Sequence, residues 1–202
     1  MDRRKRIGIM VALLLVAAVL ASCEPPAKPM QTVEALSEPV EYTEFNRLID
    51  SSDIVVVGRV VGPGQSMDAF ALMPPEEKKE HGISDDRNSP ITVYDVQVMD
   101  CWKGGFAKGE RIQMYLDGGT WDNVYYTDNT IKDFQPDRDY MLFLVRPIVK
   151  SLGYYMVNSS TQGIVSVEGE RIKDRRGNPW LLTGQSLDEA KQTFLRAQEE
   201  AP

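Results

Sequence analysis

Short apolar runs with no long helices between them constrain the fold more than any other feature of this sequence. Apolar and polar residues alternate strictly in Arg111–Leu116 and almost as regularly in Thr92–Val98. Ile54–Val61 and Tyr140–Val145 are more continuously apolar, which is typical of strands that are buried on both faces for part of their length. Further short strands are predicted at residues 154–157, 163–167 and 171–172. A parallel sheet would need alternating helices, so the pattern predicts a small antiparallel barrel of five to six strands.

Helices are predicted at the two ends of this β-rich region and in one insertion. Residues 43–50 have apolar side chains at helical spacing, with Thr43 as the expected cap. Residues 187–198 form a longer amphipathic helix, in which Ser186 and Glu189 have the spacing of a capping box. Residues 62–90 are predicted as an insertion of loop with one short, proline-started helix. Together these features indicate a single domain at residues 43–202.

The first 22 residues have the layout of an export signal. Four basic residues at positions 3–6 precede an apolar stretch of 14 residues, Ile7–Leu20. That stretch is shorter than the roughly 20 residues of a permanent membrane span. The box Leu20-Ala21-Ser22-Cys23 resembles the lipobox of bacterial lipoproteins. An ordinary secretory signal with a chance cysteine is the alternative interpretation.

The lipobox resemblance implies a processing route and a location. A diacylglyceryl transferase would attach lipid to the sulfur of Cys23, and the lipoprotein signal peptidase would cut before it. Residues 1–22 would be removed, and Cys23 would hold the protein in the bilayer on the extracytoplasmic side of the cell membrane. Residues 23–42, which contain four prolines, would then form a flexible tether.

Charge and cysteine content exclude several classes of function. Removal of residues 1–22 takes away four basic residues and one acidic residue, so the formal net charge falls from −7 to −10. A chain this acidic is repelled by phosphate backbones, so we expect no nucleic-acid partner. With Cys23 lipidated, only Cys101 remains, and no intramolecular disulfide can form. Cys101 ends a strand-like run and is expected to be a small buried residue.

Three segments together resemble the strands of a known type of barrel. These are Ser52–Val60, Tyr94–Val98 with the following Trp102-Lys103-Gly104, and Asp139–Leu144, which are similar to strands of netrin-like modules and tissue inhibitors of metalloproteinases. The order is also similar to that in uncharacterised lipoproteins of Gram-positive bacteria. The resemblance implies an OB-like barrel. It does not imply protease inhibition, because those inhibitors use a free, disulfide-fixed amino-terminal cysteine, whereas Cys23 would carry lipid on a flexible tether.

Sites for metal or acid–base chemistry are sparse. His81 is the only histidine and lies in the charged insertion, where we expect it to be solvent-exposed rather than catalytic. Five aspartates at positions 122, 128, 133, 137 and 139 could coordinate calcium, but their spacing does not match an EF-hand, and turns also select aspartate. We expect no metal or other cofactor.

Residues 117–126 form the most suggestive local element. Gly118 and Gly119 would allow close approach of a ligand, and Trp121, Tyr125 and Tyr126 would offer flat faces for stacking, which makes these five residues a possible ligand face. The alternative, which we favour, is a Gly-Gly bend after the preceding strand with Trp121 folded into the core. Trp180 is expected to pack beneath the last helix.

These observations favour a non-enzymatic surface lipoprotein, a binding or accessory module of the cell envelope. Its partner would be an unidentified envelope protein, peptide or glycan. The alternative is a cell-envelope hydrolase that uses dispersed carboxylates such as Asp95, Asp122 and Glu168, which only the tertiary structure could bring together.

Overall fold

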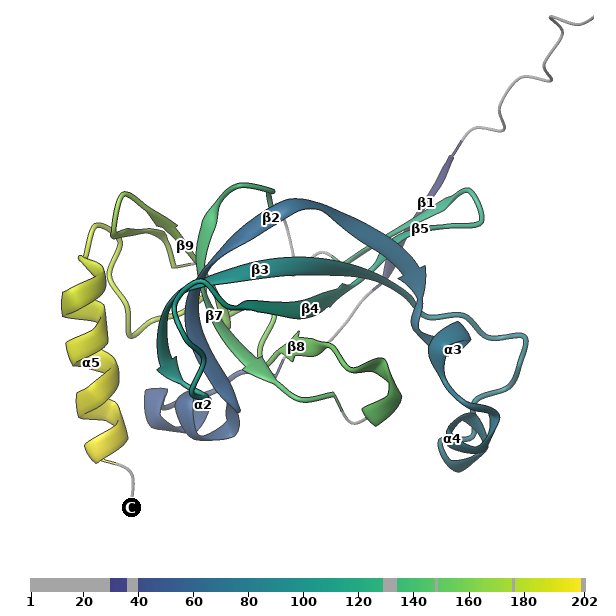
Figure 1. The fold of residues 1–202 in the computed structure, drawn as a ribbon, viewed down its shortest axis with the longest axis horizontal. Helices are drawn as coiled ribbons and strands as arrows, with labels where there is room; N and C mark the ends of the chain where they lie inside the picture. The colour runs from purple at the N-terminus through teal and green to yellow at the C-terminus, as the bar shows by residue number, and fades with distance from the viewer. Residues whose placement is uncertain (1–29, 36–39, 129–133, 148, 176, 201–202) are drawn as a thin grey trace, which may run out of the picture. The chain divides into compact units, whose positions relative to one another are not determined.

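The protein is mainly β, as the sequence predicted (Figure 1). The computed structural model describes residues 30–35, 40–128, 134–147, 149–175 and 177–200. The chain divides into two compact units, Met1–Met30 and Gln31–Pro202, and the second contains every helix and strand described. The strands are β1 (Gln31–Ala35), β2 (Ile54–Asp68), β3 (Pro90–Lys103), β4 (Arg111–Asp117), β5 (Gly119–Trp121), β6 (Val124–Asp128), β7 (Asp139–Val145), β8 (Tyr155–Val157), β9 (Ile164–Glu168) and β10 (Arg171–Asp174). The helices are α2 (Phe45–Ser51), α3 (Ala69–Leu72), α4 (Pro75–Glu80) and α5 (Leu187–Glu199), with a 3-10 turn at Lys150–Leu152.

Seven of the described strands form one sheet and three form another. The larger sheet has the order β10-β9-β7-β2-β3-β4-β8, and the smaller has the order β1-β6-β5. β8 pairs in parallel with β4 and also antiparallel with β7, through two residue pairs in each case. The larger sheet therefore has seven strands rather than the five to six predicted for the barrel, because the predicted strands at 163–167 and 171–172 form β9 and β10 and extend the sheet beyond β7. The seven strands do not close into a single barrel, since β10 remains at one end of the order.

The central strands β2 and β7 are buried on both faces, as their apolar runs predicted. Successive side chains of a strand point to opposite faces. In β2, Ile54 and Val56 pack into one apolar cluster with β3 and β4, whereas Val55 and Val57 pack into a second cluster with α2 and α5. The second cluster lies on the face that the two helices cover, and this explains why these strands are not half polar.

The helix at the C-terminal end forms where predicted and for the predicted reason. The Ser186 hydroxyl accepts the Glu189 backbone N–H, and the Glu189 carboxylate accepts the Ser186 backbone N–H, which completes the capping box. Ala190 and Phe194 of α5 are buried in the second cluster. Trp180 is half-buried and stacks on Phe45 of α2, with ring centroids 5.2 Å apart.

The predicted helix at residues 43–50 forms as α2, but its predicted cap, Thr43, is wrong. α2 begins at Phe45, and Glu44 occupies the capping position without a side-chain hydrogen bond. Thr43 therefore lies outside the cap. The buried residues Phe45, Leu48 and Ile49 determine the position of this helix, because they pack into the second apolar cluster.

The insertion at 62–90 is more regular than predicted. β2 continues through Gly62-Pro63-Gly64 to Asp68, and its pairing with β3 shifts by two residues between Val61 and Gln65. These residues therefore make a bulge in a long strand and not a turn. The proline-started helix is confirmed as α4, in which Pro75 occupies the first turn. His81 follows α4 and is exposed, as expected.

One part of the predicted tether has regular structure. Residues 31–35 form β1, which pairs in parallel with β6 over five residues, from Gln31 opposite Val124 to Ala35 opposite Asp128. The expectation of an irregular chain therefore does not hold for these five residues.

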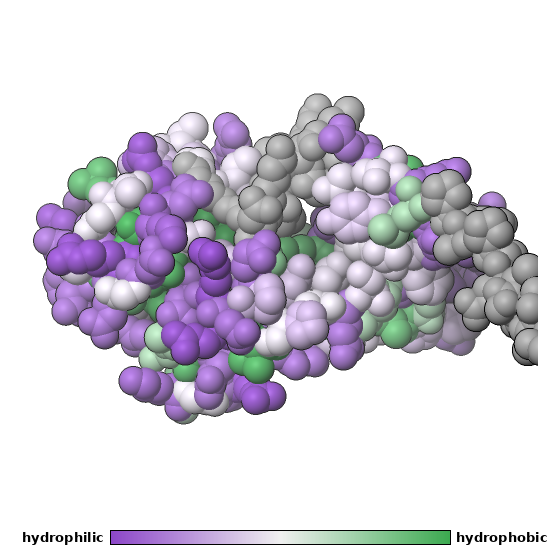
Figure 2. Space-filling view, turned by 90° about the horizontal axis from the view of Figure 1, so that it is seen from above, coloured by the Kyte–Doolittle hydropathy of each residue, from purple (hydrophilic) through white to green (hydrophobic). Residues whose placement is uncertain are grey.

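Exposed apolar residues are scattered over the surface. The face in Figure 2 is mostly hydrophilic, with separate small hydrophobic areas. No helix within the described ranges is both long and apolar enough to span a membrane.

Candidate functional site

The segment that the sequence marked as a possible ligand face folds into a β-hairpin. β5 and β6 pair antiparallel, and Asp122 and Asn123 form the two-residue turn between them. Both turn residues have positive φ, 45° and 61°, which is the conformation that a tight hairpin turn requires and that Asp and Asn tolerate. The Asp-Asn pair between two short β-prone runs was the sequence signal for this hairpin, and our sequence analysis missed it.

A cavity of about 310 Å³ lies beside this hairpin, and we call it the hairpin pocket. It is lined by Ser66, Thr92, Tyr94, Leu116, Asp117, Gly118, Gly119, Tyr125, Tyr126, Thr127, Phe134 and Gln135. The lining comes from β2, β3, β4, β5 and β6 and from the start of the segment before β7. Four of the five residues of the predicted ligand face line it, and Trp121 does not.

A chain of hydroxyl groups joins the hairpin to the larger sheet at one wall of the pocket. The Thr92 hydroxyl donates to the Gly118 carbonyl at 2.8 Å, and the Ser66 and Thr92 hydroxyl oxygens are 3.4 Å apart. Since Thr92 uses its proton on Gly118, Ser66 donates to Thr92. The backbone N–H of Thr120 donates to the Ser66 hydroxyl at 3.1 Å, and this completes the chain.

The two glycines permit this close approach. Gly118 has φ of 96°, and a Cβ there would lie 2.6 Å from the carbonyl oxygen of Tyr126. At Gly119, where φ is 137°, a Cβ would lie 2.5 Å from the Thr92 hydroxyl oxygen and 2.6 Å from that of Ser66. The Gly-Gly bend after β4 therefore exists as expected, and its role is to bring the hairpin backbone against the sheet.

Aromatic rings form the inner part of the pocket. Phe134 stacks on Tyr140 with ring centroids 4.4 Å apart and meets the Tyr94 ring edge-on at 4.9 Å. Burial raises the pKa of the Tyr94 hydroxyl, and the nearby Tyr125 and Tyr140 hydroxyls raise it further. Tyr94 therefore keeps its proton at neutral pH and can both donate and accept a hydrogen bond.

The three aromatic residues of the predicted ligand face do not share one face of the hairpin. Tyr125 pairs with Thr120, whereas Trp121 pairs with Val124, and neighbouring pairs of a hairpin point to opposite faces. Tyr125 lines the hairpin pocket, where its hydroxyl raises the pKa of the Tyr94 hydroxyl. Its side chain is 42% exposed. Trp121 is 36% exposed. Our preferred interpretation, with Trp121 in the core, is wrong, because a three-residue strand in a separate small sheet does not carry it inward.

The three carboxylates of the hydrolase alternative lie on separate elements. Asp95 is on β3 and accepts a hydrogen bond from Gln113, Asp122 is in the β5–β6 turn, and Glu168 ends β9 beside Lys173. β3 and β9 are three strand spacings apart in the sheet order, or roughly 14 Å. None of the three lines the hairpin pocket. The fold does not bring Asp95 and Glu168 within the roughly 5–9 Å that paired glycosidase carboxylates need.

The five aspartates considered for calcium binding do not form a cluster among the described residues. Asp139 forms a two-bond ion pair with Arg59, at 2.6 and 2.9 Å. Asp133 and the side chain of Asp128 lie outside the described residues. Among the residues described, no group of three or more carboxylate, histidine or cysteine side chains is placed to hold a metal ion.

Of the two cysteines, the structure describes Cys101 but not Cys23. Cys101 is a half-buried free thiol that packs against the first apolar cluster and donates to the Lys103 carbonyl at 3.3 Å. Cys23 lies outside the described residues, so its lipidation stays a prediction from the sequence.

Several residues of the pocket carried no signal in the sequence. Ser66, Thr92 and Phe134 are far apart along the chain, and each is unremarkable in its local context. Only the bulge in β2 and the fold of β5–β6 bring them together. Comparison of the sequence with models of known protein families and with curated proteins gives no match.

Proposed function

We propose that this chain is a lipid-anchored lipoprotein of the extracytoplasmic face, and that its domain binds one end of a neutral envelope glycan in the hairpin pocket. The observation that carries the binding proposal is the chemistry of the pocket lining. Hydroxyls of Ser66, Thr92 and Tyr94 and the amide of Gln135 supply uncharged hydrogen-bonding groups, and Tyr125 supplies an exposed ring. Sugar rings offer matching hydroxyls and an apolar face that stacks on aromatics.

The size of the pocket supports a small ligand. About 310 Å³ is at the lower limit of cavities that bind small molecules. It accommodates the end of a chain rather than a long segment. A single exposed carboxylate, Asp117, lies in the lining, so an anionic ligand would be disfavoured relative to a neutral one.

We propose that β2, β3, β4, β8 and β7 correspond to the five strands of an OB-like barrel. The double pairing of β8, in parallel with β4 and antiparallel with β7, supports this assignment. The β5–β6 hairpin would then be an insertion between the third and fourth strands, and it would build the binding site at one end of the barrel.

Replacement of Tyr125 by alanine tests the binding proposal. With soluble N-acetylglucosamine trimer as the probe, isothermal titration calorimetry should show binding by the unmodified protein and about tenfold weaker binding by Tyr125→Ala, because loss of one stacked ring costs about 1.4 kcal/mol. Trp121→Ala is the matched control, since Trp121 is an exposed aromatic on the opposite face of the same hairpin. No binding by the unmodified protein at millimolar trimer, or a larger loss in Trp121→Ala, would count against the proposal.

Replacement of Cys23 by alanine tests the anchor. The variant should leave the membrane fraction or keep its first 22 residues, because alanine has no thiol for the lipid. Fractionation followed by mass spectrometry of the amino terminus measures both outcomes. Cys101→Ser, which removes the other cysteine, should remain membrane-bound. Normal processing of Cys23→Ala with full membrane retention would refute the anchor.

A further inference from the structure

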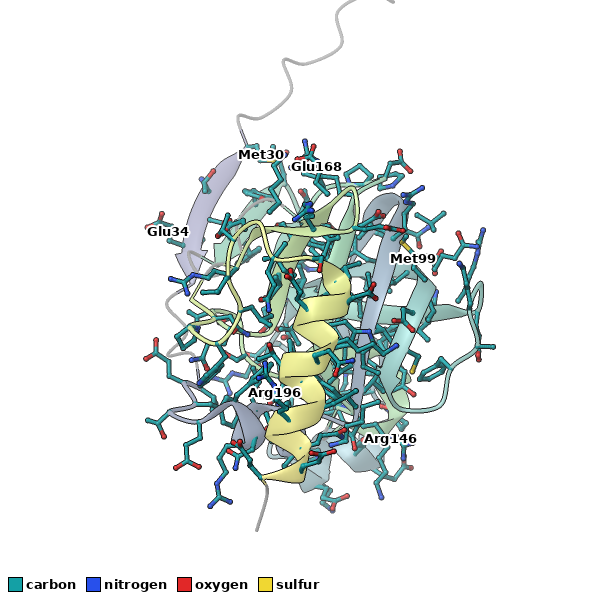
Figure 3. All side chains as sticks on the ribbon, turned by 90° about the vertical axis from the view of Figure 1, so that its left-hand side faces the viewer. Met30, Glu34, Met99, Arg146, Glu168 and Arg196 are labelled. Atoms are coloured by element: carbon teal, nitrogen blue, oxygen red, sulfur yellow. The ribbon has the colours of Figure 1, made fainter. Side chains whose placement is uncertain are left out.

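β1 presents a strand edge that no other described strand covers. It is the end strand of the smaller sheet, and no other described strand pairs with its outer side. Proteins usually protect such edges with proline, lysine, a bulge or a covering segment. The sequence of β1, Gln-Thr-Val-Glu-Ala, contains no proline or lysine, and its register with β6 is regular over all five residues. In Figure 3 β1 forms the margin of the described unit at Glu34.

The pairing with β6 determines which backbone groups point outward. The Gln31 backbone N–H donates to the Asn123 carbonyl, so Gln31 bonds toward β6. Backbone direction alternates along a strand, so Val33 and Ala35 also bond toward β6. The N–H and C=O groups of Thr32 and Glu34 therefore point away from β6, toward the open edge. The side chain of Val33 is 44% exposed.

We propose that this edge pairs antiparallel with β1 of a second copy of the chain, around a two-fold axis at Val33. In this register Thr32 of each copy lies opposite Glu34 of the other, and both are residues whose backbone groups point outward. The two copies would exchange four backbone hydrogen bonds. Val33 lies opposite its own symmetry mate, and the two exposed side chains cover each other.

The charge of Glu34 favours this register of the self-paired edge over its neighbour. A register centred on Glu34 would place two carboxylates directly opposite each other, which is destabilising. A register centred on Val33 avoids that contact, pairs all five residues and opposes each Glu34 with a threonine hydroxyl. The result is a continuous six-stranded sheet across the two copies, in the order β5-β6-β1-β1-β6-β5.

The dimer contact does not depend on the hairpin pocket being a glycan site. It adjoins that site, however, because β6 pairs with β1 on one side and also contributes Tyr125, Tyr126 and Thr127 to the pocket lining. A dimer through β1 would hold two pockets on one rigid sheet. Such a pair would bind neighbouring glycan ends with higher avidity than a single copy.

Cysteine cross-linking tests the register. In the full-length protein with Cys101→Ser, Val33→Cys should form a disulfide-linked dimer on mild oxidation, because a non-hydrogen-bonded antiparallel pair has Cα atoms about 4.5 Å apart. Gln31→Cys in the same background is the matched control. Its two copies would be offset by four residues, or roughly 13 Å, which is too far for a disulfide.

A charge variant gives a second, independent measurement. Val33→Lys should abolish the dimer in sedimentation velocity and leave the far-UV circular dichroism spectrum of the folded protein unchanged, since Val33 is exposed and packs in no core cluster of the described residues. Three outcomes would overturn the proposal: equal cross-linking at positions 31 and 33, no cross-linking at position 33, or a dimer that persists in Val33→Lys.

Discussion

Replacement of Phe194 by alanine is expected to lower the free energy of unfolding by about 3–5 kcal/mol, the usual cost of deleting a large buried aromatic side chain. Phe194 is fully buried and holds α5 against the larger sheet. Its ring lies 5.4 Å from that of Trp102 on β3. Removing the ring would leave a cavity in the second apolar cluster and would loosen the helix that covers it. Denaturant unfolding followed by far-UV circular dichroism measures the loss.

The neighbouring residue on the same helix supplies the control. Leu195 is 40% exposed, so Leu195→Ala should change the free energy of unfolding by less than about 1 kcal/mol. The two substitutions have similar effects on helix propensity, and they differ mainly in burial. If both variants lost stability equally, α5 would not dock through Phe194, and the packing of the second cluster would be incorrect.

Replacement of Gly118 by alanine is expected to cost about 2–4 kcal/mol of stability. Two effects add at this position. The positive φ of 96° strains any residue with a side chain, and the new Cβ would lie 2.6 Å from the carbonyl oxygen of Tyr126. Because the obstacle is backbone, the hairpin must move away from the sheet, and the hairpin pocket should lose its shape. Thermal unfolding and trimer titration together measure both consequences.

Gly105 separates strain from steric conflict. It also has a positive φ, 80°, but a Cβ there meets nothing within 4 Å. Gly105→Ala should therefore show only the cost of strain, about 1–2 kcal/mol, and no change in binding of the N-acetylglucosamine trimer. Equal losses of stability in the two variants would mean that the contact with Tyr126 contributes nothing.

Local sequence patterns were sufficient to predict most of the large elements. The alternation in residues 111–116 and 92–98 and the apolar runs at 54–61 and 140–145 all become strands of the larger sheet. The capping box at Ser186 and the proline at the start of α4 also appear as predicted. These signals are strong because each depends on periodicity or on a hydrogen bond between residues close in sequence.

The errors occur where distant residues decide the structure. Nothing near Gly62-Pro63-Gly64 shows that β2 continues beyond it, because pairing with β3 residues some thirty positions later supports the bulge. The segment 31–35 has little to bury, and it becomes a strand only because β6 offers an edge. Trp121 remains at the surface because its strand belongs to the small sheet and not to the core.

The sequence by itself determined that the protein is mainly β, where its main helices and strands lie and that the chain is acidic, and it predicts an export-type segment ending at Cys23. Only the tertiary structure decided which side chains meet. It joined Ser66, Thr92 and Tyr125 at one pocket, separated Trp121 from Tyr125, and kept Asp95 and Glu168 on distant strands. The physical reason is that side-chain periodicity is local, whereas strand order and register depend on packing between residues far apart in sequence.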